Sequence, residues 1–129
     1  MQKIFSQETI LNVPNREIPE IVEKFLNSDH GLTRGMSAIQ IALKINDDYP
    51  KLSLLLLNEM NKKIHFLNIR FGIKSAWTLA ISLIENLSPD DYFKIKKEFD
   101  RWNNEEKEDL LNWLNEFPDH LKILKEGKL

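Results

Sequence analysis

One loop of the sequence gathers side chains that could do chemistry. Between Ser28 and Gly35 the chain offers a carboxylate, an imidazole, a hydroxyl and a guanidinium, set among glycines. These groups can serve acid–base catalysis or phosphate binding. They also suit an ordinary connection in which one polar residue ends a helix, a glycine turns the chain and Thr33 caps the next helix. The sequence favours the connection, and an enzyme centred on Asp29, His30 and Arg34 is an alternative.

The rest of the chain offers few catalytic or metal-binding patterns. Its histidines, His30, His65 and His120, are scattered, and no two stand four residues apart, the spacing that lets one helix face present two imidazoles to a metal. There is no Glu-x-x-His pair, no glycine-rich phosphate loop and no Gly-x-Ser-x-Gly motif. Without cysteine, disulfides and thiolate metal sites are excluded. We expect no cofactor or metal, no catalytic residues outside the loop alternative, and no special role for His65 or His120.

The composition is that of one ordinary globular domain. Of the 129 residues, 42% are hydrophobic and 29% charged, which indicates neither a disordered chain nor a membrane protein. The chain does not start with a basic stretch leading into an apolar run, as a secretory signal does. Its most apolar stretches, Leu52–Leu57 and Ile73–Ile84, are shorter than the roughly 18 residues needed to cross a bilayer. We expect a single helical domain over residues 1–129, cytoplasmic and not bound to membranes.

Apolar residues recur at helical spacing along nearly the whole chain, and no stretch alternates as a half-buried strand does. The pattern predicts an all-α fold, a compact single-domain bundle of six to eight helices joined by short turns. The expected helices are Gln7–Val13, Ile18–Ser28, Arg34–Asn46, Leu52–Met60, Ile73–Asn86, Tyr92–Trp102, Asn104–Glu116 and Asp119–Glu126. The region Ile64–Phe71 is ambiguous, because Gly72 interrupts its helical spacing.

The apolar residues within these helices predict what is buried. The helix Arg34–Asn46 carries one apolar row of Met36, Ile39, Ala42 and Leu43, and a second row at Ile41 and Ile45. The helix after Asn103 is expected to bury Leu110, Leu111, Leu114 and Phe117. Trp77 and Trp102 continue the apolar faces of their helices and are expected in the core. Asn103, followed three residues later by Glu106, resembles a capping box that starts the helix between them.

Charge is segregated along the chain. Between Glu85 and Asp119 there are eleven acidic residues and five basic ones, a local net charge of −6 in a chain whose formal total is −2. A surface of one sign attracts a partner of the opposite sign. Nucleic acid is disfavoured as a partner, because binding a phosphate backbone needs clustered lysines and arginines, and this chain has only a small cluster near Lys62 and Lys63.

The acidity is concentrated on the helix Asn104–Glu116. Its acidic and amide side chains recur at spacings of four, three and four, opposite the leucines, and Trp113 lies between the two faces. A tryptophan beside acids is a candidate interface anchor. The candidate partner-binding residues are Glu105, Glu108, Asp109, Asn112, Trp113 and Glu116. A plainer interpretation is a solvated face whose first acids complement the helix dipole, although that does not account for Glu116.

A small, cysteine-free, all-α chain with a concentrated acidic face resembles bacterial immunity proteins, the cognate inhibitors of colicins and of contact-dependent growth inhibition toxins. The similarity covers size, composition and charge layout along the whole chain, and no motif carries it. It implies tight binding to a toxin domain, often a basic nuclease, whose lysines and arginines meet the acidic face.

Another class of function fits the same sequence. A small helical adaptor or regulator would bind its partner through an apolar groove, and its binding would survive high salt. The oligomeric state is open, because a dimer formed through Leu54–Leu57 or the helix of Trp77 would leave the same pattern as a buried core.

Overall fold

The computed structural model describes residues 13–67 and 73–129. Within these ranges the chain is all-α, with seven α-helices and no strand, so the expected fold class and helix number are confirmed. The helices are α2 (Ile18–Ile21, continued by a π-helical turn Val22–Leu26), α3 (Gly31–Leu43), α4 (Tyr49–Glu59), α5 (Ser75–Asn86), α6 (Tyr92–Phe99), α7 (Asn104–Trp113) and α8 (Pro118–Glu126). Of the first expected helix, Gln7–Val13, only Val13 is described, and it is not helical.

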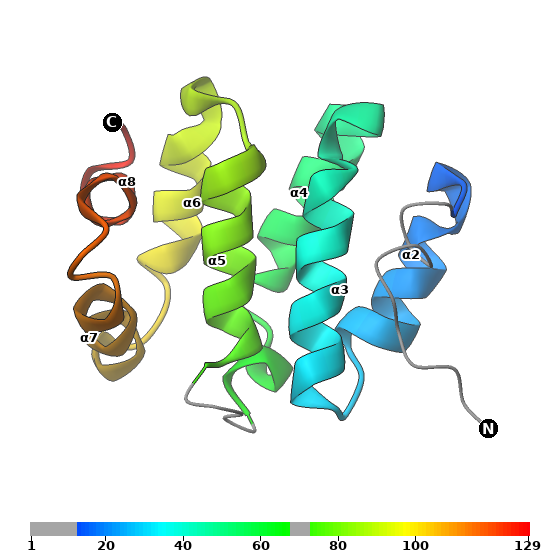
Figure 1. Cartoon of the computed structure of the whole chain (residues 1–129), viewed down its shortest axis with the longest axis horizontal. Coiled ribbons are helices and arrows are strands. Elements are labelled where there is room, and N and C mark those ends of the chain that lie inside the picture. The colour runs from blue at the N-terminus through cyan, green and yellow to red at the C-terminus, as the bar shows by residue number, and fades with distance from the viewer. Residues whose placement is uncertain (1–12, 68–72) are drawn as a thin grey trace.

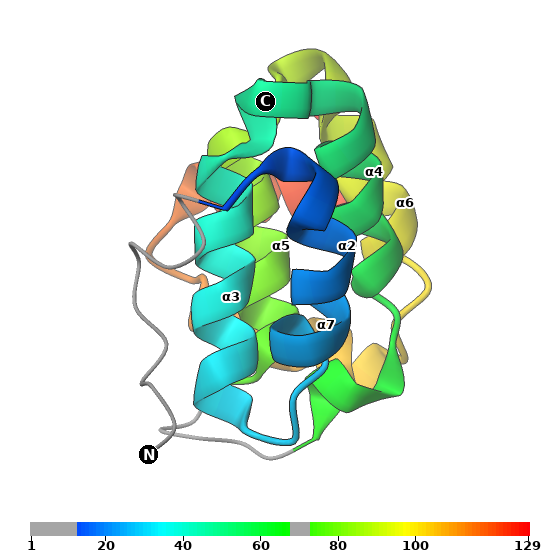
Figure 2. The ribbon, with the colours of Figure 1, turned by 90° about the vertical axis from the view of Figure 1, so that its right-hand side faces the viewer.

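The helices form two layers laid out largely in chain order. Figure 1 shows α3 and α5 side by side, with α4 and α6 packed behind them. Gly35 of α3 lies against Thr78 of α5, near the start of both helices, so the two run in the same direction. In Figure 2, turned by 90°, α2 covers the edge between α3 and α4. At the opposite end, α8 packs on α6 and α5, and α7 lies beside it (Figure 1).

α5 is the central helix, as its apolar sequence indicates. Most of its side chains are buried between the layers, among them Leu79, Leu83 and Trp77. Trp102, in the turn after α6, is also buried. The helix after Asp48 begins at Tyr49 with Pro50 in its first turn, where proline costs no hydrogen bond. No helix in the described ranges has both the length and the apolar character needed to cross a bilayer.

α3 is turned differently from what its stronger apolar row would suggest. The second row, Ile41 and Ile45, is buried together with Ala38 and Ala42. The other side of the helix exposes four large apolar residues at spacings of four, three and four: Leu32, Met36, Ile39 and Leu43. The layered packing explains this, because α3 has neighbours on only part of its circumference.

Candidate protein interface

α7 begins as its sequence predicts. The Asn103 side chain accepts a hydrogen bond from the Glu106 N–H at 2.9 Å and caps the helix. The Glu106 carboxylate does not close a reciprocal capping box. Both of its oxygens instead accept hydrogen bonds from Lys74 Nζ, at 2.7 and 2.8 Å, just before α5. Lys74 and Glu106 are only 12% and 16% exposed, so this ion pair ties the start of α7 to the start of α5.

The end of α7 differs from the expectation. The helix stops at Trp113, and Leu114 to Phe117 lead into α8, which starts at Pro118. Glu105, Glu108, Asp109 and Asn112 are all exposed on the helix, whereas Glu116 is exposed in the turn after it. The expected row therefore consists of a helical part and one acid beyond the helix end.

Apart from Glu106, the carboxylates on and just after α7 have no basic partner among the described residues. None of Glu105, Glu108, Asp109 and Glu116 forms an ion pair with any residue in ranges 13–67 and 73–129. The acids around α6 are different, because Asp91, Glu98 and Asp100 pair with Lys94, Arg101 and Lys96. No ion pair within the described ranges thus compensates the charge of Glu105, Glu108, Asp109 and Glu116.

Two exposed aromatic rings accompany these acids. Trp113 is 45% exposed and Phe117 is 48% exposed, and their rings stack with centroids 6.3 Å apart and planes inclined by 21°. Phe117 was expected to be buried, which is wrong, because the helix ends before it and the turn carries it outward. Trp113 leans on the buried Trp77 of α5 at 5.8 Å, and His120 lies 5.9 Å from the Phe117 ring.

The fold separates the three residues of the alternative enzyme site, Asp29, His30 and Arg34. Arg34 is completely buried and donates hydrogen bonds to Ser75 Oγ at 3.0 Å and to the carbonyl oxygens of Ser28 at 2.7 Å and Leu67 at 3.0 Å. Burial lowers the pKa of Arg34, and the charge of Asp29 opposes that shift. His30 is exposed at the start of α3, and its N–H donates to Ser28 Oγ at 3.1 Å. Arg34 therefore points inward, away from the solvent side where Asp29 and His30 lie.

A buried chain of polar groups continues from Arg34. His65, for which the sequence indicated no special role, is completely buried. Its Nδ1 lies 2.9 Å from Ser75 Oγ, and its Nε2 lies 2.9 Å from Glu59 Oε1. Burial favours a raised pKa for Glu59, but hydrogen bonds from His65 and Lys62 outweigh burial and lower it. The Glu59 side chain is therefore an ionised carboxylate, which can only accept hydrogen bonds. In the hydrogen bond between the two residues, His65 Nε2–H is the donor and Glu59 Oε1 is the acceptor.

This network has the order of a nucleophile, a base and a carboxylate, but it is enclosed. Ser75 and Glu59 are each 3% exposed, and Ser75 Oγ already accepts the Arg34 Nε–H. The hydrogen bonds of this network connect α3, α4 and α5, which carry Arg34, Glu59 and Ser75. Sequence reasoning missed it because no local spacing links residues 34, 59, 65 and 75. In the part of the chain that the structure describes, no three His, Asp or Glu residues cluster as metal ligands do.

Comparison with protein-family models, with curated proteins and with solved structures gives no match to this chain.

Proposed function

We propose that the protein is a protein-binding inhibitor of the immunity type, which neutralises a basic toxin domain such as a nuclease. The docking surface would be the α7 face, made of Glu105, Glu108, Asp109, Asn112, Trp113, Glu116 and Phe117. One observation carries the proposal: the exposed rings of Trp113 and Phe117 stack on a segment whose exposed carboxylates form no ion pair with any described residue. Because the chain has no cysteine, it suits a reducing compartment, and we place its action in the cytoplasm.

The aromatic pair supports protein binding rather than a solvated surface. Tryptophan is enriched among the residues that dominate binding energy, typically where it becomes fully desolvated at the centre of an interface. Trp113 is held on one side by Trp77, so little side-chain freedom is lost when a partner covers its other side. Covering the exposed halves of the two rings would contribute about 1 kcal/mol each.

The carboxylates support a basic partner. Charges that the protein leaves unpaired act at long range, speed the encounter with a positive surface and oppose an encounter with a negative one. The same field disfavours nucleic acid, whose phosphates would be repelled by α7. The partner expected from this surface is a protein with clustered lysines and arginines around an apolar contact.

The experiment starts with the tagged protein in lysate of its native host, with parallel washes at low and high salt and identification by mass spectrometry. The recovered partner is then purified, and its dissociation constant is measured against the wild type and two variants. Trp113→Ala should raise the constant at least tenfold. The matched control is Phe93→Ala, which removes a 56% exposed ring from α6, away from the α7 face, and should leave the constant within twofold. Equal effects of the two variants would remove the α7 face as the docking surface.

A second candidate function, a helical adaptor, is favoured by the exposed row of α3. Leu32, Met36 and Ile39 line a shallow cavity of about 170 Å³ together with Thr78 of α5. A partner seated there would bind as strongly at high salt as at low salt, and Ile39→Glu would weaken it whereas Trp113→Ala would not. The salt dependence of the recovered complex thus separates the two candidates.

A further inference from the structure

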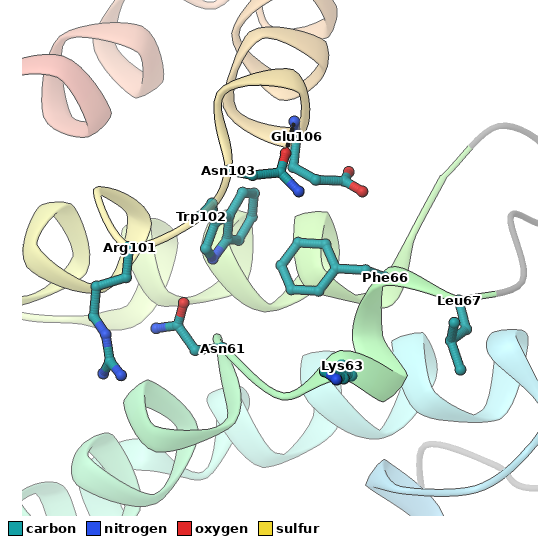
Figure 3. A pocket seen from close by; sticks show the side chains of 8 residues that line it. All are labelled: Asn61, Lys63, Phe66, Leu67, Arg101, Trp102, Asn103 and Glu106. Carbon is teal, nitrogen blue, oxygen red and sulfur yellow. Dashed lines mark hydrogen bonds between the residues drawn. The ribbon is translucent and has the colours of Figure 1, made fainter.

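We infer that the protein has a second binding site, separate from the α7 face, for a small organic anion that carries a flat apolar ring. The site is a cavity of about 320 Å³ where the end of α4, the 3-10 segment Lys63–Phe66 and the turn between α6 and α7 meet (Figure 3). Its volume lies at the lower end of the range of small-molecule sites, about 300–1,000 Å³. A compact ring-bearing molecule fits this size.

The apolar side of the cavity is made by two aromatic rings. Phe66 meets Trp102 edge to face, with centroids 5.0 Å apart and planes at 89°. Phe99 supports Trp102 at the same distance, and the indole Nε1–H donates to the Met60 carbonyl oxygen at 3.1 Å. The indole is therefore fixed in place and its only donor is used. Trp102 is only 4% exposed, so the ring surface open to a ligand is mainly that of the half-buried Phe66, which suits another flat ring.

The carboxylate at the cavity is already satisfied by the protein. Glu106 takes both hydrogen bonds from Lys74, so it neither repels an anion strongly nor needs a cationic ligand. The Asn103 side-chain oxygen is likewise used, as the cap of α7. Two strong acceptors that line the cavity are thus occupied before any ligand arrives.

Lys63, Arg101 and Asn103, which line the cavity, keep donors that no described residue uses. Lys63 forms no ion pair with any residue that the structure describes, and the Asn103 amide nitrogen donates to none of them. Arg101 is 66% exposed. Its Nη1 pairs with Glu98 Oε1 at 3.2 Å, and its other N–H groups remain available to a ligand. Figure 3 shows Arg101 and Lys63 on either side of Asn61, with the rings of Trp102 and Phe66 above them in this view. These unused donors would bind a carboxylate or phosphate, and the neighbouring ring surface would contact an aromatic group on the same ligand.

The Asn61 side chain can accept a hydrogen bond from a ligand. Its amide nitrogen donates to the Glu98 carbonyl oxygen at 3.2 Å and to Glu98 Oε1 at 2.8 Å. Its amide oxygen accepts no hydrogen bond from the described residues. A hydroxyl or ring N–H on the ligand would find its partner there.

The test uses three probes of similar size: phenyl phosphate, benzoate and the neutral benzyl alcohol. Each is titrated into the full-length protein while the assigned indole N–H signal of Trp102 is followed by two-dimensional NMR. At least one anion should bind at least tenfold more tightly than benzyl alcohol, and the stronger of the two identifies the charged group. Equal binding of all three probes would overturn the inference. So would the absence of any shift of the Trp102 signal at probe concentrations up to 20 mM, which is about five times the largest dissociation constant of interest.

Two variants complete the test. Lys63→Gln removes the free cation from an exposed position, so the fold is retained, and it should weaken the bound anion at least threefold. The control Lys97→Gln removes an exposed α6 lysine that does not line the cavity and should leave binding unchanged. If the two variants behave alike, the positive charge acts only through the net charge of the protein, and the site assignment is wrong. None of these outcomes depends on whether the α7 face binds a toxin.

Discussion

Lys74, at the start of α5, holds both carboxylate oxygens of Glu106 in the first turn of α7. This pair spans 32 residues of sequence and fixes where the acidic helix sits on the domain. At the other end of α7, the Trp113 ring packs against Trp77, in the first turn of α5. α7 is therefore attached to one helix at both ends, and its outward carboxylates keep a fixed position relative to the exposed rings.

Removing the Lys74–Glu106 pair should destabilise the domain measurably. Lys74→Met leaves a largely buried carboxylate without its partner, so we expect the free energy of unfolding to fall by about 1–3 kcal/mol, as measured by urea denaturation. Lys94→Met is the control, because it breaks the more exposed pair with Asp91 and should cost less than about 1 kcal/mol. A smaller loss for Lys74→Met than for Lys94→Met would show that the pair does not anchor α7.

Charge reversal on the α7 face should act through the association rate. In Glu105→Lys/Asp109→Lys/Glu116→Lys we expect the dissociation constant for the basic partner to rise at least tenfold, with most of the loss in association at low salt. Stopped-flow mixing at two ionic strengths measures this. The control Glu17→Lys/Glu20→Lys/Glu23→Lys makes the same change in net charge on exposed residues around α2. Should both triple variants slow association equally, the location of the acids would be irrelevant.

Arg34 should be one of the most sensitive positions for stability. Arg34→Met would leave Ser75 Oγ and two carbonyl oxygens without their donor, at a cost of about 3 kcal/mol or more. Arg34→Lys keeps the charge but cannot place three donors in a rigid fork, so it should recover only part of the loss. The exposed Arg16→Met serves as the control in the same urea series. A loss below 1 kcal/mol in Arg34→Met would contradict the role assigned to the network.

Glu59 should make the stability of the domain sensitive to acid. Its pKa in the folded state is below the ordinary value of 4.5. The folded state therefore binds this proton less well than the unfolded chain. The contribution is fully present above the ordinary value and is lost as the pH falls through the lowered pKa. Urea midpoints between pH 7 and pH 3.5 should decline less steeply in Glu59→Gln than in the wild type. Glu23→Gln, on an exposed side chain, should follow the wild type.

Much of the architecture could be predicted because apolar spacing and helix signals are local. The Asn103 cap and the central position of the Trp77 helix follow from residues a few positions apart. The side of α3 that faces the core could not be predicted, because both of its apolar rows satisfy helical spacing. Which row is buried depends on where the neighbouring helices lie. That is decided by packing across the whole domain.

The candidate interface shows the same division. The exposure of Glu105, Glu108 and Asp109 follows from their place opposite Leu110 and needs no knowledge of other helices. Other parts of the site depend on distant contacts. Phe117 is exposed because α7 ends early, and the charge of Glu106 is neutralised by a lysine 32 positions away. Neither could be inferred from local spacing.

The layout of the helices in chain order has a consequence for synthesis. A chain emerging from the ribosome can pack α3 and α4, and then α5, before the C-terminal third is made. α7 comes late, and both of its anchors, Lys74 just before α5 and Trp77 within α5, are already in place. The proposed docking surface is thus assembled on a finished scaffold. A truncated chain that stops before Asn104 would carry none of the residues of the α7 face and would therefore lack the proposed docking surface.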